Sequence, residues 1–369
     1  MNNTRLMTAF ILVLVIAAGG LPPHAFAQTT SDGFVSTPAG KKAFLNGDYA
    51  EAERFFRDAL REAEAAKVTP GRMATAIGNL AQVLAAQHRF GEAEELFDRA
   101  LKVEASANVD PRVRTILLLN LSAVYTTTER FGRAESVLEE AVGLCRKHFG
   151  PDSRELAGAL KRQGIVYAMT KRVDKAESRL KEALAIAERQ PNLPPEELAT
   201  ILSSLAGVYS LQNKWNRAEP LLLRAVDLSE RTYGADHPLV SDVLINLGEQ
   251  SMRQGNLDRA EAVFRRALSI RQAAFGRDHV DTARIAARLA SVLTALNKND
   301  EAHSLFVAAL PIEERVLGPA DAEVASSLEQ FGKLLRQMQD TSRAETIEAR
   351  ARSIRETLSY TIPAGQIVK

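Results

Sequence analysis

The sequence predicts an all-α fold, a right-handed superhelical solenoid of antiparallel helix pairs. Three observations predict it: a repeat of 41 to 42 residues, helical spacing of the apolar residues within each repeat, and the amino-acid composition. Of the 369 residues, 46% are hydrophobic and 25% are charged, which is typical of a folded globular chain. The 21 glycines, 14 prolines and 6% aromatic residues are too few to favour a β-sandwich or a β-barrel.

The N-terminal segment is predicted to be a secretory signal peptide over residues 1–27. Arg5 precedes an apolar stretch at residues 9–18, and Ala-Phe-Ala at residues 25–27 resembles a bacterial cleavage site. The apolar stretch is much shorter than the roughly 20 residues that a membrane-spanning helix needs, so a retained anchor is the weaker alternative. Cleavage would leave residues 28–35 as a disordered N-terminus and no membrane span, and we expect a periplasmic or secreted location.

The charge balance and the cysteine content limit the class of ligand. There are 47 basic and 46 acidic residues, and loss of Arg5 with the signal peptide leaves 46 of each. A net charge of zero argues against a nucleic-acid ligand, because phosphate binding needs an excess of Lys and Arg. The single cysteine, Cys145, excludes an internal disulfide and a thiolate metal cage. We expect its thiol to be packed, with an intermolecular disulfide as the alternative.

An Ala-Glu dipeptide or a close variant marks each repeat. The marker alanines are followed by a bulky apolar residue four positions later in the first seven repeats, and by another alanine seven positions later in all eight. Offsets of 0, 4 and 7 lie on one side of an α-helix, so each repeat has a helix, here called the second helix, with a small-large-small buried stripe. The markers are Ala52, Ala93, Ala134, Ala176, Ala218, Ala260, Ala302 and Ala344.

A second apolar stripe lies 16, 13, 12 and 9 residues before the marker and predicts a first helix. The residue 12 positions before the marker is small, which lets the two helix backbones approach closely, as an antiparallel hairpin requires. These small residues are Ala81, Ser122, Gly164, Ala206, Gly248, Ala290 and Gly332. An apolar residue closes the turn between the helices at Tyr49, Phe90, Phe131, Val173, Trp215 and Leu257.

Several positions depart from this pattern. Pro311 falls inside a second helix, where a proline costs about 3 kcal/mol, so we expect a kink or a break there. Residues 38–46 have little apolar periodicity, so the first repeat is predicted to lack a strong first helix. Asn299 and Thr341 replace the apolar turn residue in the last two repeats, which indicates a frayed or capping end. Further replacements within the stripes are Gln163, His303 and Glu348.

The combined pattern resembles the tetratricopeptide repeat (TPR). The 42-residue unit, with connections such as Tyr-Gly-Ala-Asp-His-Pro at residues 233–238, is similar to the longer repeat of the kinesin-light-chain-like subclass. The resemblance covers residues 36–358 as about eight hairpins and leaves residues 359–369 as a C-terminal tail. It implies that the stacked hairpins form a superhelix with a concave face, and that function resides on that face.

No motif for catalysis or cofactor binding is present. The chain has no Gly-x-Gly-x-x-Gly, no Walker-type phosphate loop, no His-Glu-x-x-His and no Gly-x-Ser-x-Gly. We therefore predict no cofactor, no metal site and no catalytic residue. Asp-His pairs at residues 236–237 and 278–279 stand before first helices. Metal ligation is one interpretation of them, but we predict that Asp236 and Asp278 cap the helices that follow.

Polar residues stand 14 positions before the markers, nearly opposite the buried stripe of the first helix. They are Asn79, Asn120, Arg162, Ser204, Asn246, Arg288 and Gln330. In TPR proteins this register faces the inner groove, and the resemblance implies that an asparagine there holds the backbone of a bound peptide. Glu249 and Arg284 lie one helical turn from this register. The predicted peptide groove therefore contains Asn79, Asn120, Arg162, Asn246, Glu249, Arg284 and Arg288.

Two alternatives apply to these groove residues. Asn246, Arg284 and Arg288 match part of the terminal-carboxylate clamp of chaperone-binding TPR proteins, but Ser203 and Gly207 stand where that clamp has Lys and Asn. The other alternative is that polar first-helix residues are merely hydrated. One amide contact is worth about 0.5–1.5 kcal/mol, whereas micromolar binding needs about 8 kcal/mol, so several repeats must act together.

The function predicted is that of a non-enzymatic scaffold that binds a peptide or a partner protein in its concave groove. A structural or self-assembling envelope component is the alternative. An enzyme would need catalytic groups on the concave face, where the nearest cluster is Asp242, Glu249, Arg253 and Arg284. The Glu and Arg residues along the helices, such as Glu53 and Arg57, are predicted to form solvated pairs worth a few tenths of a kcal/mol each.

Overall fold

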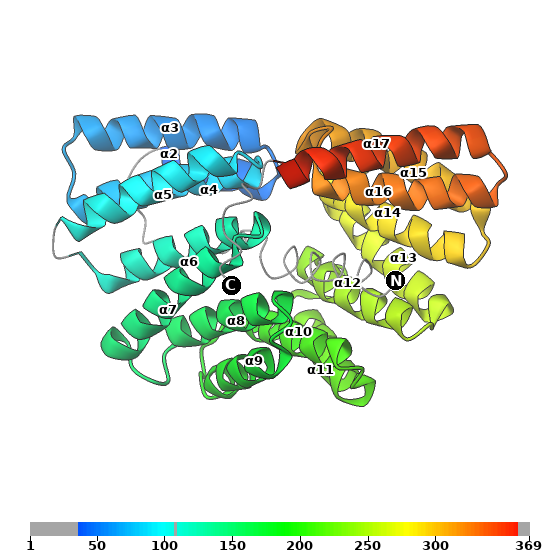
Figure 1. Ribbon diagram of the computed structural model, residues 1–369. Helices are drawn as coiled ribbons and strands as arrows, with labels where there is room; N and C mark the ends of the chain where they lie inside the picture. The colour runs from blue at the N-terminus through cyan, green and yellow to red at the C-terminus, as the bar shows by residue number, and fades with distance from the viewer. Residues whose placement is uncertain (1–35, 107–108, 361–369) are drawn as a thin grey trace. The chain divides into compact units, whose positions relative to one another are not determined.

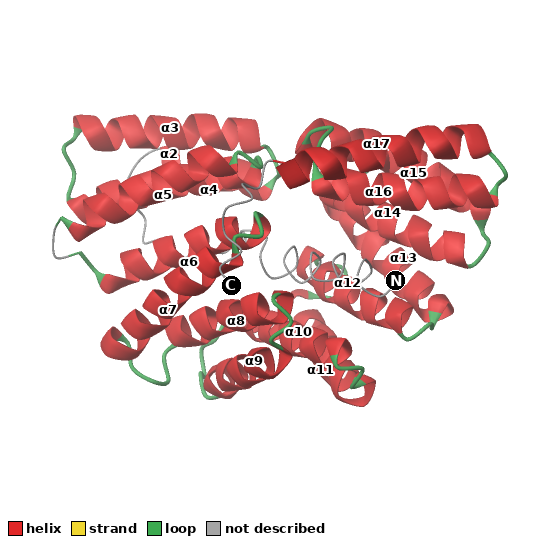
Figure 2. Cartoon of the chain, viewed as in Figure 1, coloured by secondary structure: helices red, strands yellow, loops and turns green. Residues whose placement is uncertain are grey.

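The computed structural model describes residues 36–106 and 109–360, and α-helices joined by short turns make up these ranges (Figures 1 and 2). The predicted signal peptide, the segment 28–35 and the end of the predicted tail lie outside them. The helices are α2 (Ser36–Leu45), α3 (Tyr49–Ala65), α4 (Pro70–Ala86), α5 (Phe90–Ala105), α6 (Pro111–Thr127), α7 (Phe131–His148), α8 (Arg154–Met169), α9 (Val173–Glu188), α10 (Pro195–Leu211), α11 (Trp215–Tyr233), α12 (Pro238–Arg253), α13 (Leu257–Phe275), α14 (Val280–Ala295), α15 (Asn299–Leu317), α16 (Ala322–Gln337) and α17 (Thr341–Tyr360). The predicted all-α fold of consecutive helix pairs is confirmed.

The chain divides into two compact units, and the boundary falls inside α11, between Ser229 and Glu230. In unit 1, which runs to Ser229, α2 packs on α3, α4 on α5, α6 on α7 and α8 on α9. In unit 2, which begins at Glu230, α12 packs on α13, α14 on α15 and α16 on α17. First helices of neighbouring hairpins also contact each other, in the series α4, α6, α8 and α10 and between α14 and α16. Each unit therefore has a row of adjacent first helices.

The helix boundaries follow the predicted register. From α3 onward, every second helix begins at the predicted turn position, including Asn299 and Thr341, which are not apolar. The chain enters most of these turns through a residue with positive φ, such as His88, Lys171 or Asn297. The marker alanines and the bulky residues four positions after them are buried in the first seven repeats. The large side chains of this stripe are Phe56, Phe97, Leu138, Leu180, Leu222, Phe264 and Phe306.

The small residues of the first helices lie directly against these bulky side chains. A Cβ added to Gly164 would lie 2.6 Å from Leu180 Cγ, and one added to Gly248 would lie 2.8 Å from Phe264 Cζ. At Gly332 the corresponding atom is Glu348 Cγ at 2.7 Å. The predicted close approach of the two helices is thus confirmed, and it leaves no room for a methyl group at these positions.

Neither the break expected at Pro311 nor the lack of a first helix in the first repeat is found among the described residues. α15 runs without a break through Pro311, which is exposed. The proline has no N–H to donate to the backbone carbonyl of Val307, and Val307 is 49% exposed. Water can satisfy that carbonyl, so the cost of the proline is reduced. The first repeat also has a first helix, α2, because burial of Ala43 and Phe44 against α3 compensates for its weak apolar periodicity.

The predicted aspartate caps are also wrong. The N-cap residues of α12 and α14 are His237 and His279, not Asp236 and Asp278. His237 Nδ1 accepts a hydrogen bond from the backbone N–H of Leu239 at 3.2 Å. Both histidine rings stack on the aromatic residue four positions earlier, at centroid distances of 4.9 and 4.8 Å. The ring contact places the imidazole over the helix end, so the histidine takes the capping role.

The Glu of the Ala-Glu marker has a structural function that the sequence analysis missed. In five repeats it pairs with a basic residue that precedes the second helix of the next hairpin, a series we call the hairpin ladder. The ion pairs of this series are Arg89–Glu53 at 2.8 Å, Arg130–Glu94 at 2.5 Å, Arg172–Glu135 at 2.8 Å, Lys214–Glu177 at 3.6 Å and Lys298–Glu261 at 2.7 Å. Glu53 forms the predicted pair with Arg57, at 2.6 Å, and in addition links adjacent hairpins through Arg89, a role that the sequence analysis did not assign to it.

Two glycines of α8 offer a matched test of helix contact. Gly164→Ala should destabilise the chain by about 1–3 kcal/mol, because the new methyl overlaps Leu180 in a packed interface. Gly158→Ala should instead stabilise it by about 0.5–1 kcal/mol, because a Cβ there meets nothing within 4 Å and alanine has the higher helix propensity. Denaturant unfolding followed by circular dichroism measures both. Equal shifts in the two variants would contradict the close contact.

Candidate functional site

The predicted groove residues lie on the rows of first helices, and each unit has its own set. We call Asn79 on α4, Asn120 on α6, Arg162 on α8 and Ser204 on α10 the first-helix face of unit 1. Asn246 on α12, Arg288 on α14 and Gln330 on α16 form the first-helix face of unit 2.

Burial differs along these faces from what the sequence predicts. Asn79, Asn120 and Ser204 are only 3%, 4% and 0% exposed, although the register points away from the hairpin core. The reason is that first helices of neighbouring hairpins contact each other, so this side of each helix is partly covered by the next helix. The other members of the two faces, among them Arg162, Asn246 and Arg288, are partly exposed.

On the first-helix face of unit 2, the predicted groove charges are paired with each other or with neighbouring carboxylates. Arg288 Nε donates to Glu249 Oε1 at 3.0 Å, which joins two residues of the predicted groove. Arg284 donates from Nε to Glu323 at 2.7 Å and from Nη1 to Asp281 at 2.9 Å. A ligand carboxylate at Arg284 or Arg288 would have to displace these partners. A terminal-carboxylate clamp at these residues is therefore disfavoured.

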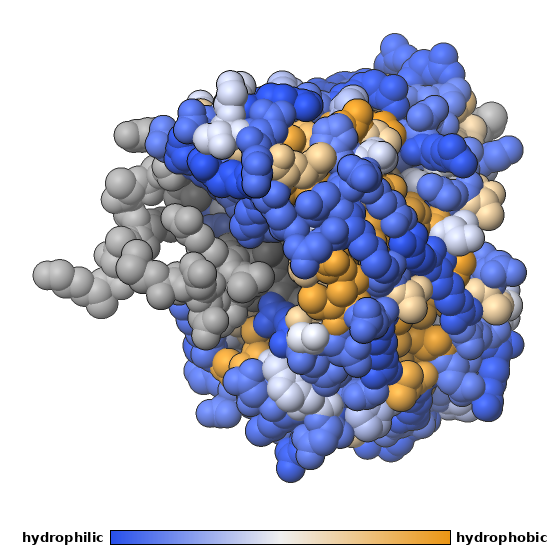
Figure 3. Space-filling view, turned by 90° about the vertical axis from the view of Figure 1, so that its right-hand side faces the viewer, coloured by the Kyte–Doolittle hydropathy of each residue, from blue (hydrophilic) through white to orange (hydrophobic). Residues whose placement is uncertain are grey.

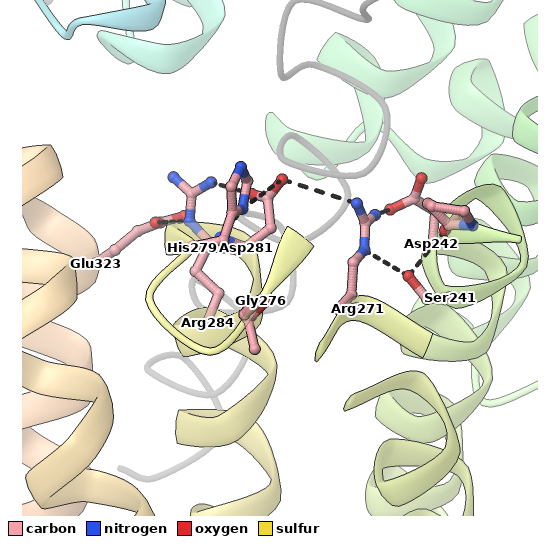
Figure 4. A network of polar contacts seen from close by, with 10 residues as sticks. Ser241, Asp242, Arg271, Gly276, His279, Asp281, Arg284 and Glu323 are labelled. Atoms are coloured by element: carbon pink, nitrogen blue, oxygen red, sulfur yellow. Dashed lines mark hydrogen bonds and ion pairs between the residues drawn. The ribbon is translucent and has the colours of Figure 1, made fainter. Parts of the chain in front are cut away.

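Arg271, on the second helix α13, joins this network and was not predicted (Figure 4). It is only 8% exposed, and its Nε donates to Ser241 Oγ at 2.6 Å. It also forms an ion pair with Asp242 and lies 3.8 Å from Asp281. Burial alone would raise the pKa of Asp281, but the charges of Arg284 and Arg271 outweigh it and lower that pKa.

A sequence signal for Arg271 exists 11 residues after the marker. This position is buried in the first seven repeats, and in four of them it has a small residue: Ala63, Cys145, Ala187 and Ser229. Glu104, Arg271 and Glu313 are buried charged residues at the same position. Glu104 is paired with Arg114 at 2.7 Å, and the thiol of Cys145 is packed, as predicted. A charged residue at a repeat position that otherwise has small residues is the signal that would have identified Glu104, Arg271 and Glu313 in the sequence.

Glu313 is a buried residue whose carboxyl group has a raised pKa. It is 1% exposed, and its Oε2 has no hydrogen-bond partner in the part of the chain that the structure describes. Burial raises the pKa of Glu313 to about 7, and the charge of Glu323 acts in the same direction. Ser327, Arg284 and Arg288 oppose the rise. The carboxyl can bind a proton near neutral pH, but its burial keeps it out of reach of a substrate.

The cluster considered for catalysis does not form one site of free acids and bases. Asp242 is paired with Arg271, and Glu249 with Arg288. Burial lowers the pKa of Arg253 to about 10, and the charge of Glu249 opposes this. Over residues 36–106 and 109–360, no group of three His, Cys, Asp or Glu side chains could hold a metal ion.

In unit 1, two neighbouring basic residues of α8 form no ion pair, in contrast to the paired arginines of unit 2. On the neighbouring helix α6, Arg112 pairs with Glu155 of α8 at 3.1 Å, and Arg114 pairs with Glu104 of α5. Lys161, however, has only a hydroxyl partner, Thr200 Oγ1 at 3.1 Å. Arg162 has no hydrogen-bond or ion-pair partner among the described residues. Burial lowers the pKa of Lys161 to about 8; the charge of Arg162 acts in the same direction and that of Glu197 opposes it. Burial also lowers the pKa of Arg162 to about 10.

Hydrophilic residues predominate on the side that Figure 3 presents, and apolar residues show between them in several groups, one of them near the centre of the view. In the described ranges the large hydrophobic residues that are exposed are Leu223, Val307 and Met338, which lie on or beside three different helices. No helix among the described residues has the length and hydropathy that crossing a membrane requires.

Glu313→Gln is expected to change how stability depends on pH. In the folded chain this carboxyl stays protonated up to about pH 7, whereas after unfolding it ionises near its usual pKa of 4.5. The folded state therefore retains a proton between these values, and stability falls as the pH rises through them, by on the order of 2–3 kcal/mol. The glutamine variant should lack this loss, so it should be the more stable chain at pH 8 and nearly equal to the parent at pH 4.5.

Denaturant unfolding across this pH range measures the difference. Glu314→Gln is the matched control, because Glu314 is the adjacent residue and its carboxylate is partly exposed and paired with Arg350 at 2.7 Å. Parallel pH curves for the parent and the Glu313→Gln variant would show that Glu313 is ionised in the folded chain.

The chain was compared with known protein families. A tetratricopeptide repeat model matches residues 43–105, 113–189, 242–314 and 288–357, and a second model with this description matches residues 198–239. No curated protein sequence matches significantly.

Solved structures with a similar fold agree with this result. BtubC (BKLC) from P. vanneervenii has a TM-score of 0.50 and 24% identity, and the match covers 62% of this chain and 91% of that one. A Rap protein complexed with competence and sporulation factor has a TM-score of 0.54 and 14% identity, covering 92% of this chain and 99% of that one. Apo RapI has a TM-score of 0.56 and 12% identity, covering 78% and 99%. Since the family models match most of the sequence, the chain belongs to the tetratricopeptide repeat family.

Proposed function

We propose that this protein is a non-enzymatic scaffold that binds an extended peptide or a segment of a partner protein on its first-helix faces. The observation that carries the proposal is the unpaired, partly buried Arg162 in the middle of the first-helix face of unit 1. A desolvated cation without a partner is unfavourable for the chain alone and becomes favourable when a ligand supplies the partner.

The fold supports a binding role. TPR proteins typically bind other proteins, and one structure with the same fold was solved as a complex with competence and sporulation factor. The ion pairs of the first-helix face of unit 2 occupy the acids and bases that an enzyme would need. We infer from this pairing that the protein holds its partner without transforming it.

We also propose that the protein acts outside the cytoplasmic membrane, on the basis of residues 1–27 of the sequence. Protein isolated from the periplasmic fraction should have the intact mass of a chain that begins at Gln28. Recovery of the full-length chain from the membrane fraction would instead favour the retained anchor.

Photo-crosslinking tests the location of the binding surface. Benzoylphenylalanine in place of Ile116 on α6, one helical turn from Asn120, or in place of Gln330 on α16 should form adducts with other proteins in a cell-envelope extract. The same group in place of Leu223 or Val307 is the matched control, because both are exposed on second helices, at 46% and 49%. Adducts from the first-helix positions and none from the controls are expected; mass spectrometry identifies both products.

Each alternative predicts a different crosslinking pattern. Adducts only from the controls would place binding on the second helices and contradict the proposal. Adducts that join two copies of this chain, at every position, would favour the self-assembling component.

A further inference from the structure

Basic residues are distributed unevenly over the first helices. In unit 1, α4, α6 and α8 carry six basic residues and one acidic residue, and α10 adds two acidic ones. In unit 2, α12, α14 and α16 carry five basic and five acidic residues. The excess of positive charge on first helices therefore belongs to unit 1, in a chain whose net charge is only +1.

Within unit 1 the uncompensated charge is concentrated on α8. Arg154, at the start of the helix, is paired with Glu197, but Lys161 and Arg162 have no carboxylate partner among the described residues. Lys161 uses one of its three N–H donors, on Thr200. The two side chains thus leave several donors and two positive charges available within one helical turn.

The backbone of α8 is accessible next to these charges. Gly158 lies four residues before Arg162, on the same side of the helix, and a Cβ added there meets nothing within 4 Å. Glycine lowers helix stability, and here no packing contact requires it, unlike at Gly164 in the same helix. An exposed helix backbone beside a cation allows a ligand main chain to approach closely.

The adjacent helix α10 contributes neutral hydrogen-bonding groups. Thr200 contacts Lys161, and Ser203 follows it on the same side of α10. Ser203 is 9% exposed, and its Oγ has no hydrogen-bond partner within the described ranges. Since α8 packs against α10, the cations of α8 and a hydroxyl group without a hydrogen-bond partner, Ser203 Oγ, belong to two adjacent helices.

We propose that Lys161 and Arg162 on α8 bind the carboxylate of an acidic side chain in an extended peptide, whose backbone crosses α8 at Gly158. The inference rests on the proposed function and names the chemistry of its ligand. Charge complementarity favours this occupant, because neither cation forms an ion pair among the described residues, and Glu197, whose charge acts on Lys161, is already paired with Arg154. Unit 2 has no such unpaired arginines at the predicted groove positions, since Arg284 is paired with Glu323 and Arg288 with Glu249.

A random dodecapeptide library displayed on phage tests the specificity of the full chain. Peptides selected by the parent chain should be enriched in Asp or Glu at one position, and those selected by Arg162→Gln should show a weaker enrichment, because Lys161 remains. Arg146→Gln is the matched control, because Arg146 is exposed on the second helix α7 and paired with Glu182 at 2.9 Å. Its selected peptides should keep the acidic preference.

A selected peptide, labelled with fluorescein, then gives affinities at constant ionic strength. Arg162→Gln should weaken binding by about 10- to 100-fold, as expected for the loss of one charge-assisted hydrogen-bonding group. Gly158→Leu should weaken it as well while leaving the circular dichroism spectrum and the unfolding midpoint of the chain unimpaired. Replacing the acidic residue of the peptide by its amide should weaken binding to the parent chain more than binding to Arg162→Gln, which keeps the cation of Lys161 alone.

Several results would overturn the inference. Selected peptides without an acidic preference would refute it and leave peptide binding intact. Competition by inorganic phosphate at the affinity of the peptide would show a site for free anions rather than side-chain carboxylates. If no peptide is selected while first-helix crosslinks to a partner protein persist, the acidic-peptide inference fails and the scaffold function stands; if the crosslinks are also absent, both fail.

Discussion

The backbones of the two helices in a hairpin can approach closely only where a small residue of the first helix faces a bulky residue of the second. At Gly164 and Gly248 this contact is so close that a methyl group would overlap the opposing side chain. The same pair of positions recurs in successive repeats, so each hairpin has the same internal geometry and presents the same apolar surface to its neighbours. The rest of the structure depends on this contact, because a hairpin of fewer than 45 residues cannot bury its apolar face alone.

Repetition of this contact also determines where the chain can vary. The buried stripes use one side of each helix, so the opposite side of the first helices carries no packing requirement of its own hairpin. In unit 2 this side has become a network in which Arg284, Arg288 and Arg271 each meet a carboxylate. In unit 1, Lys161 and Arg162 do not. Two faces with the same architecture therefore offer a ligand very different electrostatics.

The spacing of the sequence was sufficient to predict the hairpins and the start of each second helix, because these depend on contacts at fixed separations along the chain. It failed at Pro311, since the cost of a proline depends on whether the freed carbonyl reaches water, and at His237 and His279, since their capping depends on stacked aromatic rings. Residue types at the candidate site were predicted, but their pairing was not. The partner of Arg288 is 39 residues away, and only the stacking of neighbouring hairpins brings it there.

The pairing decides which face can bind a charged ligand with a gain in free energy. At Arg288 a ligand carboxylate replaces an existing carboxylate, so one ion pair is exchanged for another and the released Glu249 is left without its cation. At Arg162 no such exchange occurs, and the full charge-assisted interaction contributes to binding. A protein with almost no net charge can in this way select an acidic ligand at one place on its surface, because the local imbalance of charge, and not the total, determines the interaction.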